Sequence, residues 1–93
     1  MKILQTPTFQ RKYKKLNKNE LILVNAILDE ILEDVEVGVL KKGDLGSIRV
    51  HKKHKGKQEF LIAYWSTKGA LEIIDMGSHE NFYRDLKRRE RGR

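Results

Sequence analysis

Histidine, tyrosine and cationic side chains in the second half of the chain could together act on a phosphodiester. Arg49, His51 and Lys53 lie two residues apart, so a regular strand points all three side chains to one face of its sheet. His79 precedes Tyr83 by four residues, a spacing that permits one helical face. Metal-free RNA cleavage requires a base for the 2′-hydroxyl, an acid for the leaving 5′-oxygen and cations for the phosphorane. These residue types fit those tasks.

The alternation along the same strand predicts which face is buried. Ile48 and Val50 alternate with the basic residues, so we expect these two apolar side chains to face the helices. His51 could equally be an ordinary polar residue on the solvated face of a half-buried sheet, and His79 could be a cap or loop histidine. His54 is expected at a solvated hairpin tip.

The composition narrows the class of protein. With 93 residues, of which 39% are apolar, we expect one core and a single domain over residues 1–93. The chain has no cysteine and three histidines, so neither a metal site nor a cofactor is expected. No apolar run approaches the ~20 residues that span a bilayer. We therefore expect a cytoplasmic protein that does not contact a membrane.

The formal net charge of +7 favours a polyanionic partner such as nucleic acid. Positive residues gather in segments 11–18, 49–57 and 84–93, and the chain ends in a basic tail over residues 87–93. An acidic block extends from Asp29 to Glu36. It can be read as a solvated helix face, or as a surface that directs RNA to the opposite side, where we expect the 49–57 hairpin.

Hydrophobic periodicity predicts an α+β fold. An N-terminal strand over residues 3–6 precedes a two-helix hairpin. The second helix begins at a capping box from Asn17 to Glu20. Its apolar residues recur at spacings of three and four as far as Val35. The period then changes to two. Three runs separated by turns predict a three-stranded antiparallel meander, and a short C-terminal helix follows Gly77. The three strand runs are Ile48–His51, Phe60–Trp65 and Leu71–Met76.

Several short strings, taken in order, resemble the RelE/ParE superfamily of toxins. They are Phe9-x-Arg11-x-x-x-Lys15-Leu16, Lys42–Leu45, Ile48–His51, Phe60–Tyr64 and Gly77–Tyr83. The resemblance implies a cytoplasmic toxin of a type II toxin-antitoxin system, neutralised by a cognate antitoxin protein. Toxins of the RelE branch cut messenger RNA in the ribosomal A site, whereas those of the ParE branch inhibit DNA gyrase without nuclease residues. Fold alone does not separate the two branches.

The resemblance also implies roles for individual residues. His51 and His79 match the active-site histidines of a nuclease subgroup with a Gly-x-His ending, and Tyr83 matches its terminal aromatic residue. Many RelE-type nucleases carry an arginine on the central strand, where this chain has Leu61. The remaining candidates, for binding RNA, are Arg49, Lys53, Lys55, Arg84 and Lys87.

Together with these residues, the resemblance implies a metal-independent, ribosome-dependent messenger-RNA endoribonuclease that inhibits translation. Two alternatives stay open. The chain could be a ParE-like toxin that inhibits DNA gyrase, or a basic RNA- or ribosome-binding protein that does no chemistry.

Overall fold

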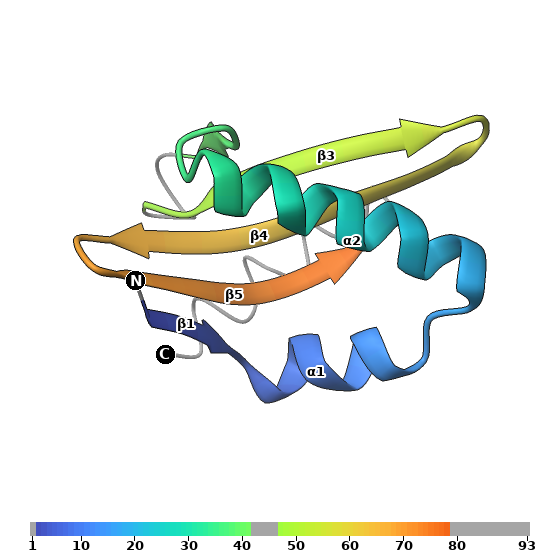
Figure 1. The fold of residues 1–93 in the computed structure, drawn as a ribbon, viewed down its shortest axis with the longest axis horizontal. Helices are drawn as coiled ribbons and strands as arrows, with labels where there is room; N and C mark the ends of the chain where they lie inside the picture. The colour runs from blue at the N-terminus through green and yellow to red at the C-terminus, as the bar shows by residue number, and fades with distance from the viewer. Residues whose placement is uncertain (1, 42–46, 79–93) are drawn as a thin grey trace.

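The computed structural model describes residues 2–41 and 47–78 of the chain. It confirms the predicted α+β class, with an N-terminal strand, a helix hairpin and an antiparallel meander. The predicted C-terminal helix and the basic tail 87–93 lie outside the described residues. In chain order the elements are β1 (Lys2–Gln5), α1 (Pro7–Lys14), α2 (Lys18–Glu33), β2 (Val39–Leu40), β3 (Arg49–Lys55), β4 (Gln58–Thr67) and β5 (Ala70–Gly77) (Figure 1).

Within the described residues the strands form one sheet in the order β1-β5-β4-β3-β2. The first strand pairs in parallel with the last, and every other neighbouring pair is antiparallel. Strand β2 was not predicted. Val39 and Leu40 lie opposite Val50 and Arg49, and two residues are too few to show a period of two.

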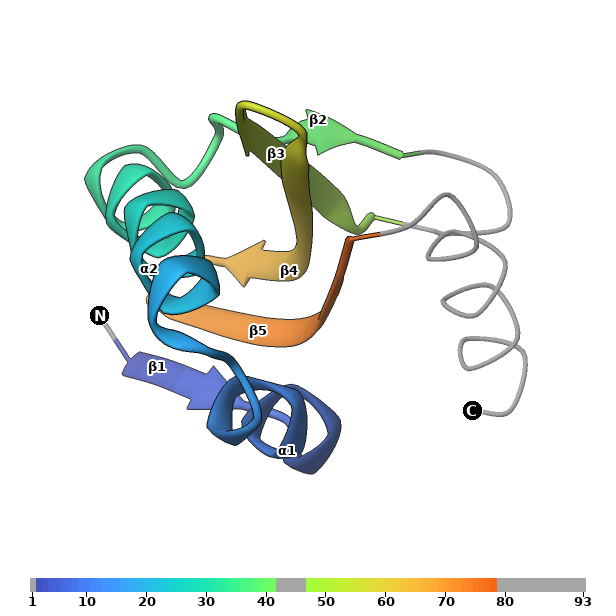
Figure 2. The same ribbon diagram turned by 90° about the vertical axis from the view of Figure 1, so that its right-hand side faces the viewer.

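Both helices lie on the same side of the sheet (Figure 2). Helix α2 packs on β3 and β4, and α1 packs on β5. Neither of these two helices is long and apolar enough to cross a membrane. The main core lies between the helices and the sheet, and its buried residues are Phe9, Leu23, Val24, Ile27, Ile31, Phe60, Ile62, Tyr64, Leu71, Ile73 and Met76.

A second buried cluster contains only sheet residues and one residue that precedes β3. It consists of Ile48, Val50, Leu61, Ala63 and Ile74. Successive side chains of a strand point to opposite faces, and Leu61 and Ala63 alternate along β4 with the main-core residues Phe60, Ile62 and Tyr64. The second cluster therefore lies on the face of the sheet that is turned away from the helices.

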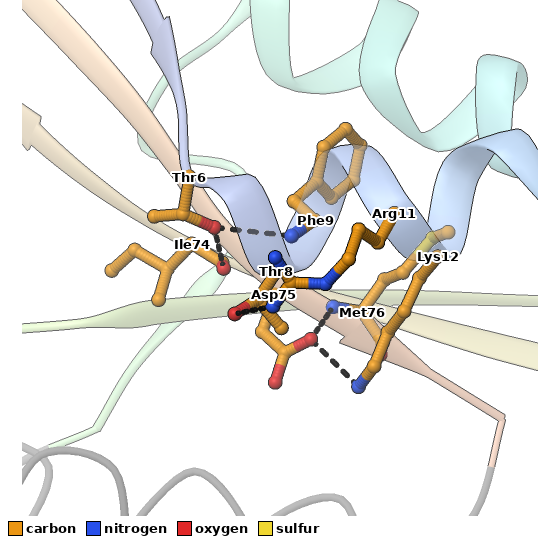
Figure 3. Close-up of polar contacts among 8 residues, drawn as sticks. All are labelled: Thr6, Thr8, Phe9, Arg11, Lys12, Ile74, Asp75 and Met76. Atoms are coloured by element: carbon orange, nitrogen blue, oxygen red, sulfur yellow. Dashed lines mark hydrogen bonds and ion pairs between the residues drawn. The ribbon is translucent and has the colours of Figure 1, made fainter.

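Polar caps fix the start of each helix, and the capping box of the second helix is the one that the sequence predicts. The Thr6 side chain accepts a hydrogen bond from the Phe9 backbone and donates one to the carbonyl oxygen of Ile74, which ties α1 to β5 (Figure 3). Lys12 of α1 adds an ion pair of 2.8 Å to the fully buried Asp75. At α2, Asn17 and Glu20 form the complete capping box, in which each side chain accepts from the other's backbone N–H.

A buried tyrosine holds the segment that leads from α2 to β2. The Tyr64 hydroxyl donates to the carbonyl oxygen of Val35 at 2.8 Å and accepts from the backbone N–H of Gly38 at 2.9 Å. Burial raises the pKa of the Tyr64 phenol, so the hydroxyl keeps its proton and both hydrogen bonds. This contact fixes the connection beside β3, where the candidate site lies.

Candidate active site on strand β3

The basic residues of β3 share one face, as predicted, but it is the face covered by the helices. Arg49, His51 and Lys53 pair with Tyr64, Ile62 and Phe60 respectively, and all three partners belong to the main core under the helices. Directly opposite residues of antiparallel strands project to the same side.

The prediction that Ile48 and Val50 face the helices is therefore wrong. Both side chains pack in the second cluster, beside Leu61 and Ala63. The physical reason lies in β4, which is apolar on both faces and so gives no sequence signal for the face on which the helices pack.

A glutamate of α2 joins His51 to Lys53. His51 Nε2 lies 2.7 Å from Glu30 Oε1, and Lys53 Nζ lies 2.7 Å from Glu30 Oε2. The hydrogen bond from Lys53, and next that from His51, lower the pKa of the Glu30 carboxyl. Glu30 is thus ionised at neutral pH and accepts from both partners, which makes Nε2 the protonated nitrogen of a neutral His51 ring.

The position of Glu30 also corrects the reading of the acidic block. The sequence suggested that the block and the basic 49–57 hairpin lie on opposite sides of the molecule. Glu30 instead reaches into the basic row of β3. Opposite charges stabilise each other across the contact between α2 and β3, although pairs this exposed contribute only about 1 kcal/mol or less.

Arg49 has a positional role at the start of the strand. Its Nη1 donates to the carbonyl oxygens of Gly38 at 2.9 Å and Glu36 at 3.3 Å. These hydrogen bonds connect β3 to the segment between α2 and β2, which the Tyr64 hydroxyl also contacts. Arg49 was predicted to bind RNA, and in this structure its guanidinium is engaged by the protein backbone.

Lys55 ends the row differently. Its side chain is exposed and makes no hydrogen bond or ion pair with any described residue. It borders a pocket of about 350 Å³ that is also lined by Asn19, Ile22 and Gln58. No local pattern in the sequence indicates Asn19, Ile22 and Gln58, because only the packing of α2 against the β3–β4 hairpin brings them together.

The opposite face of β3 carries a second set of basic side chains. Lys52 pairs with Leu61, and His54 pairs with Glu59. Lys52 and His54 are both exposed, and the exposure of His54 agrees with its predicted place at a hairpin tip. Leu61 is 5% exposed. The position at which many RelE-type nucleases carry arginine therefore lies on the opposite face of the sheet from His51.

His79, Tyr83, Arg84 and Lys87 lie outside the described residues. Among residues 2–41 and 47–78, no group of three or more histidine, aspartate or glutamate side chains could hold a metal ion.

Comparison with known proteins defines the class to which this fold belongs. Residues 3–87 match the sequence profile of the ParE-like toxin of type II bacterial toxin-antitoxin systems. The chain therefore belongs to this family of toxins and to the wider RelE/ParE superfamily. No curated protein sequence matches the chain.

Solved toxin structures share the fold at low sequence identity. A chain of the intact E. coli RelBE toxin-antitoxin complex superposes with a TM-score of 0.68 at 15% identity, covering 85% of this chain and 96% of that one. The isolated E. coli RelE toxin gives 0.62 at 16% identity, with 94% and 96% covered. The YoeB/ParE toxin from Agrobacterium tumefaciens gives 0.63 at 16% identity, with 85% and 99% covered.

Proposed function

We propose that this toxin arrests growth by cleaving messenger RNA on the ribosome, with His51 as the general base. One observation carries the proposal. The Glu30 carboxylate lies 2.7 Å from His51 Nε2, which leaves the lone pair of the ring on Nδ1. That nitrogen has no hydrogen-bond partner within the described part of the chain, so it can accept the proton of a 2′-hydroxyl.

The reaction follows from this arrangement. His51 removes the proton, and the 2′-oxygen attacks the adjacent phosphorus, which yields a 2′,3′-cyclic phosphate and releases the 5′-oxygen. The ionised Glu30 then stabilises the imidazolium that His51 has become, as a carboxylate does in a catalytic triad. The His51 side chain is 17% exposed, which leaves part of the ring open to a substrate.

The other roles rest on the sequence. His79 supplies the proton to the leaving 5′-oxygen, and Tyr83 stacks on a base next to the scissile bond. Lys53, Lys55, Arg84 and Lys87 bind phosphates of the RNA backbone. This scheme requires no metal ion and no cofactor.

The proposed partners are the ribosome with its messenger RNA, and a cognate antitoxin. Membership of a type II toxin family supports the antitoxin, as does the similarity of the fold to a chain of the RelBE toxin-antitoxin complex. We expect the antitoxin to cover basic side chains of this toxin in the cytoplasm and so to compete with RNA.

Inducing the wild-type toxin in cells tests the function. Primer extension on several transcripts should show new 5′ ends within translated regions soon after induction, while markers of DNA breakage stay at their uninduced level. Intact transcripts together with rising DNA breakage would contradict the proposal.

That contrary outcome would support a second candidate function, inhibition of DNA gyrase. A specific observation favours it: on the face of the sheet that is turned away from the helices, Leu61 packs with Val50 and Ala63 where an arginine could have bound phosphate. A toxin of this kind would act by binding and would do no chemistry.

A further inference from the structure

The pocket beside Lys55 gathers polar groups that the fold itself does not use. Asn19 and Ile22 come from the first turns of α2, while Lys55 and Gln58 pair across the end of the β3–β4 hairpin. The amides of Asn19 and Gln58 and the ammonium of Lys55 make no hydrogen bond with other described residues. Three residues whose polar side-chain groups have no partner among the described residues therefore line one pocket.

The residues that line the pocket differ in chemistry: one is apolar, two are amides and one is a lysine. Ile22 offers an exposed apolar surface, 54% accessible, which can pack against the flat face of a base. Each amide presents one donor and one acceptor side by side, the arrangement that reads the edge of a nucleobase. Lys55 adds a positive charge suited to a phosphate.

The surroundings of the pocket favour an anionic ligand. Lys57 is exposed at the hairpin turn next to it. The acidic residue in the first turn of α2, Glu20, is already engaged, because its carboxylate accepts the backbone N–H of Asn17. The volume of about 350 Å³ lies within the range of pockets that bind small ligands.

We propose that this pocket binds one unpaired nucleotide of an RNA. Lys55 contacts its phosphate, Ile22 packs on its base, and Asn19 and Gln58 read the base edge. This inference rests on the proposed action on RNA, but the pocket is separate from the His51–Glu30 pair. The pocket binds the RNA away from the scissile bond, and the affinity for RNA therefore depends on which base occupies the pocket.

Binding of labelled RNA hexamers to the full-length toxin, measured by fluorescence anisotropy, tests the pocket. Homopolymers of A, C and U serve as probes at two salt concentrations. Lys55→Met should weaken binding to all three and lower the salt slope by about one. Gln58→Ala should reduce the ratio between the tightest and weakest homopolymer by about fivefold or more.

Matched controls lie elsewhere on the surface. Lys68→Met removes an exposed lysine from the β4–β5 turn, and Gln10→Ala removes an exposed amide from α1. Neither should change affinity or base preference. Equal effects of Lys55→Met and Lys68→Met would overturn the inference. So would the absence of hexamer binding by the wild type, or equal competition by duplex DNA or an acidic peptide.

Transcript cleavage in cells separates this inference from the proposed function. If the wild type cuts no transcripts but hexamer binding still depends on Lys55 and Gln58, the pocket stands and the nuclease proposal fails. If the wild type cuts transcripts while both pocket variants bind RNA like the controls, the nuclease proposal stands and the pocket fails.

Discussion

The two ends of β3 use the same kinds of basic residue in different ways. At its start, Arg49, His51 and Lys53 each have an oxygen acceptor, either on α2 or on the segment that follows it. At its end, Lys55 has no acceptor among the described residues and borders a pocket. Basic side chains of one strand can therefore hold it to a helix at one position and stay available to a ligand a few residues further on.

The largest expected effect is a loss of catalysis at the start of β3, where His51 lies. His51→Ala should lower messenger-RNA cleavage about 10²–10⁴-fold, because it removes the proposed base. His54→Ala is the matched control on the same strand, since its side chain is exposed on the opposite face. Reporter-transcript cleavage after induction measures both. If His54→Ala abolished cleavage and His51→Ala did not, the catalytic side chain would lie on the other face.

The next largest effect is a loss of stability when Gly38 is substituted. Gly38 lies in the segment between α2 and β2 that Arg49 contacts. A Cβ at Gly38 would lie 2.8 Å from the Tyr64 hydroxyl oxygen and 3.1 Å from the backbone of Val50. Gly38→Ala should therefore lower the free energy of unfolding by about 3 kcal/mol, as overpacking of a closed interior does. Urea denaturation measures it, with the exposed Glu36→Ala as a control that should change little. A fully stable Gly38→Ala would show that this segment is loosely held.

A smaller loss is expected when the tyrosine itself changes. Tyr64→Phe leaves the Gly38 N–H and the Val35 carbonyl without their buried partner, which should cost about 2 kcal/mol of unfolding free energy. Tyr13→Phe is the matched control. It removes one part-buried bond to Asn25, and about 1 kcal/mol is expected. Equal losses in the two variants would mean that the Tyr64 contact does not fix the connection.

The smallest expected effect is a pH dependence of stability that arises from the ion pairs of Glu30 with His51 and Lys53. The pKa of Glu30 lies below its ordinary value of 4.5 in the folded chain, so its contribution to stability is complete above that value and is lost as the pH falls through the folded pKa. Stability of the wild type should therefore fall more steeply below about pH 5 than that of Glu30→Gln, by less than about 1 kcal/mol. Urea denaturation over a pH series measures the difference, and parallel curves would argue against the ion pairs.

The order of the described elements other than β2 could be predicted, because each of them has a local signal in the sequence. The capping box at Asn17 and Glu20 marks the start of α2, and the change of period from three and four to two marks the meander. The shared face of Arg49, His51 and Lys53 also follows from spacing alone. These features depend on residues near one another in the chain.

The surroundings of the site could not be predicted, because they depend on how distant elements pack. Nothing in the sequence says that α2 lies over β3, and so nothing joins Glu30 to His51. The apolar run of β4 hides which face the helices cover, which is why Val50 was assigned to the wrong side. The pocket beside Lys55 arises from the same packing, since Asn19 and Gln58 lie far apart in the sequence.

The central claim is that Glu30 fixes His51 with its lone pair on Nδ1. Nitrogen-15 NMR of the imidazole rings in the labelled full-length toxin, with His51→Gln to assign the signals, tests it most directly. For the neutral ring, we predict that the wild type carries the proton on Nε2 and that Glu30→Ala carries a mixture of both tautomers. A neutral His51 with its proton on Nδ1, unchanged by Glu30→Ala, would contradict the account.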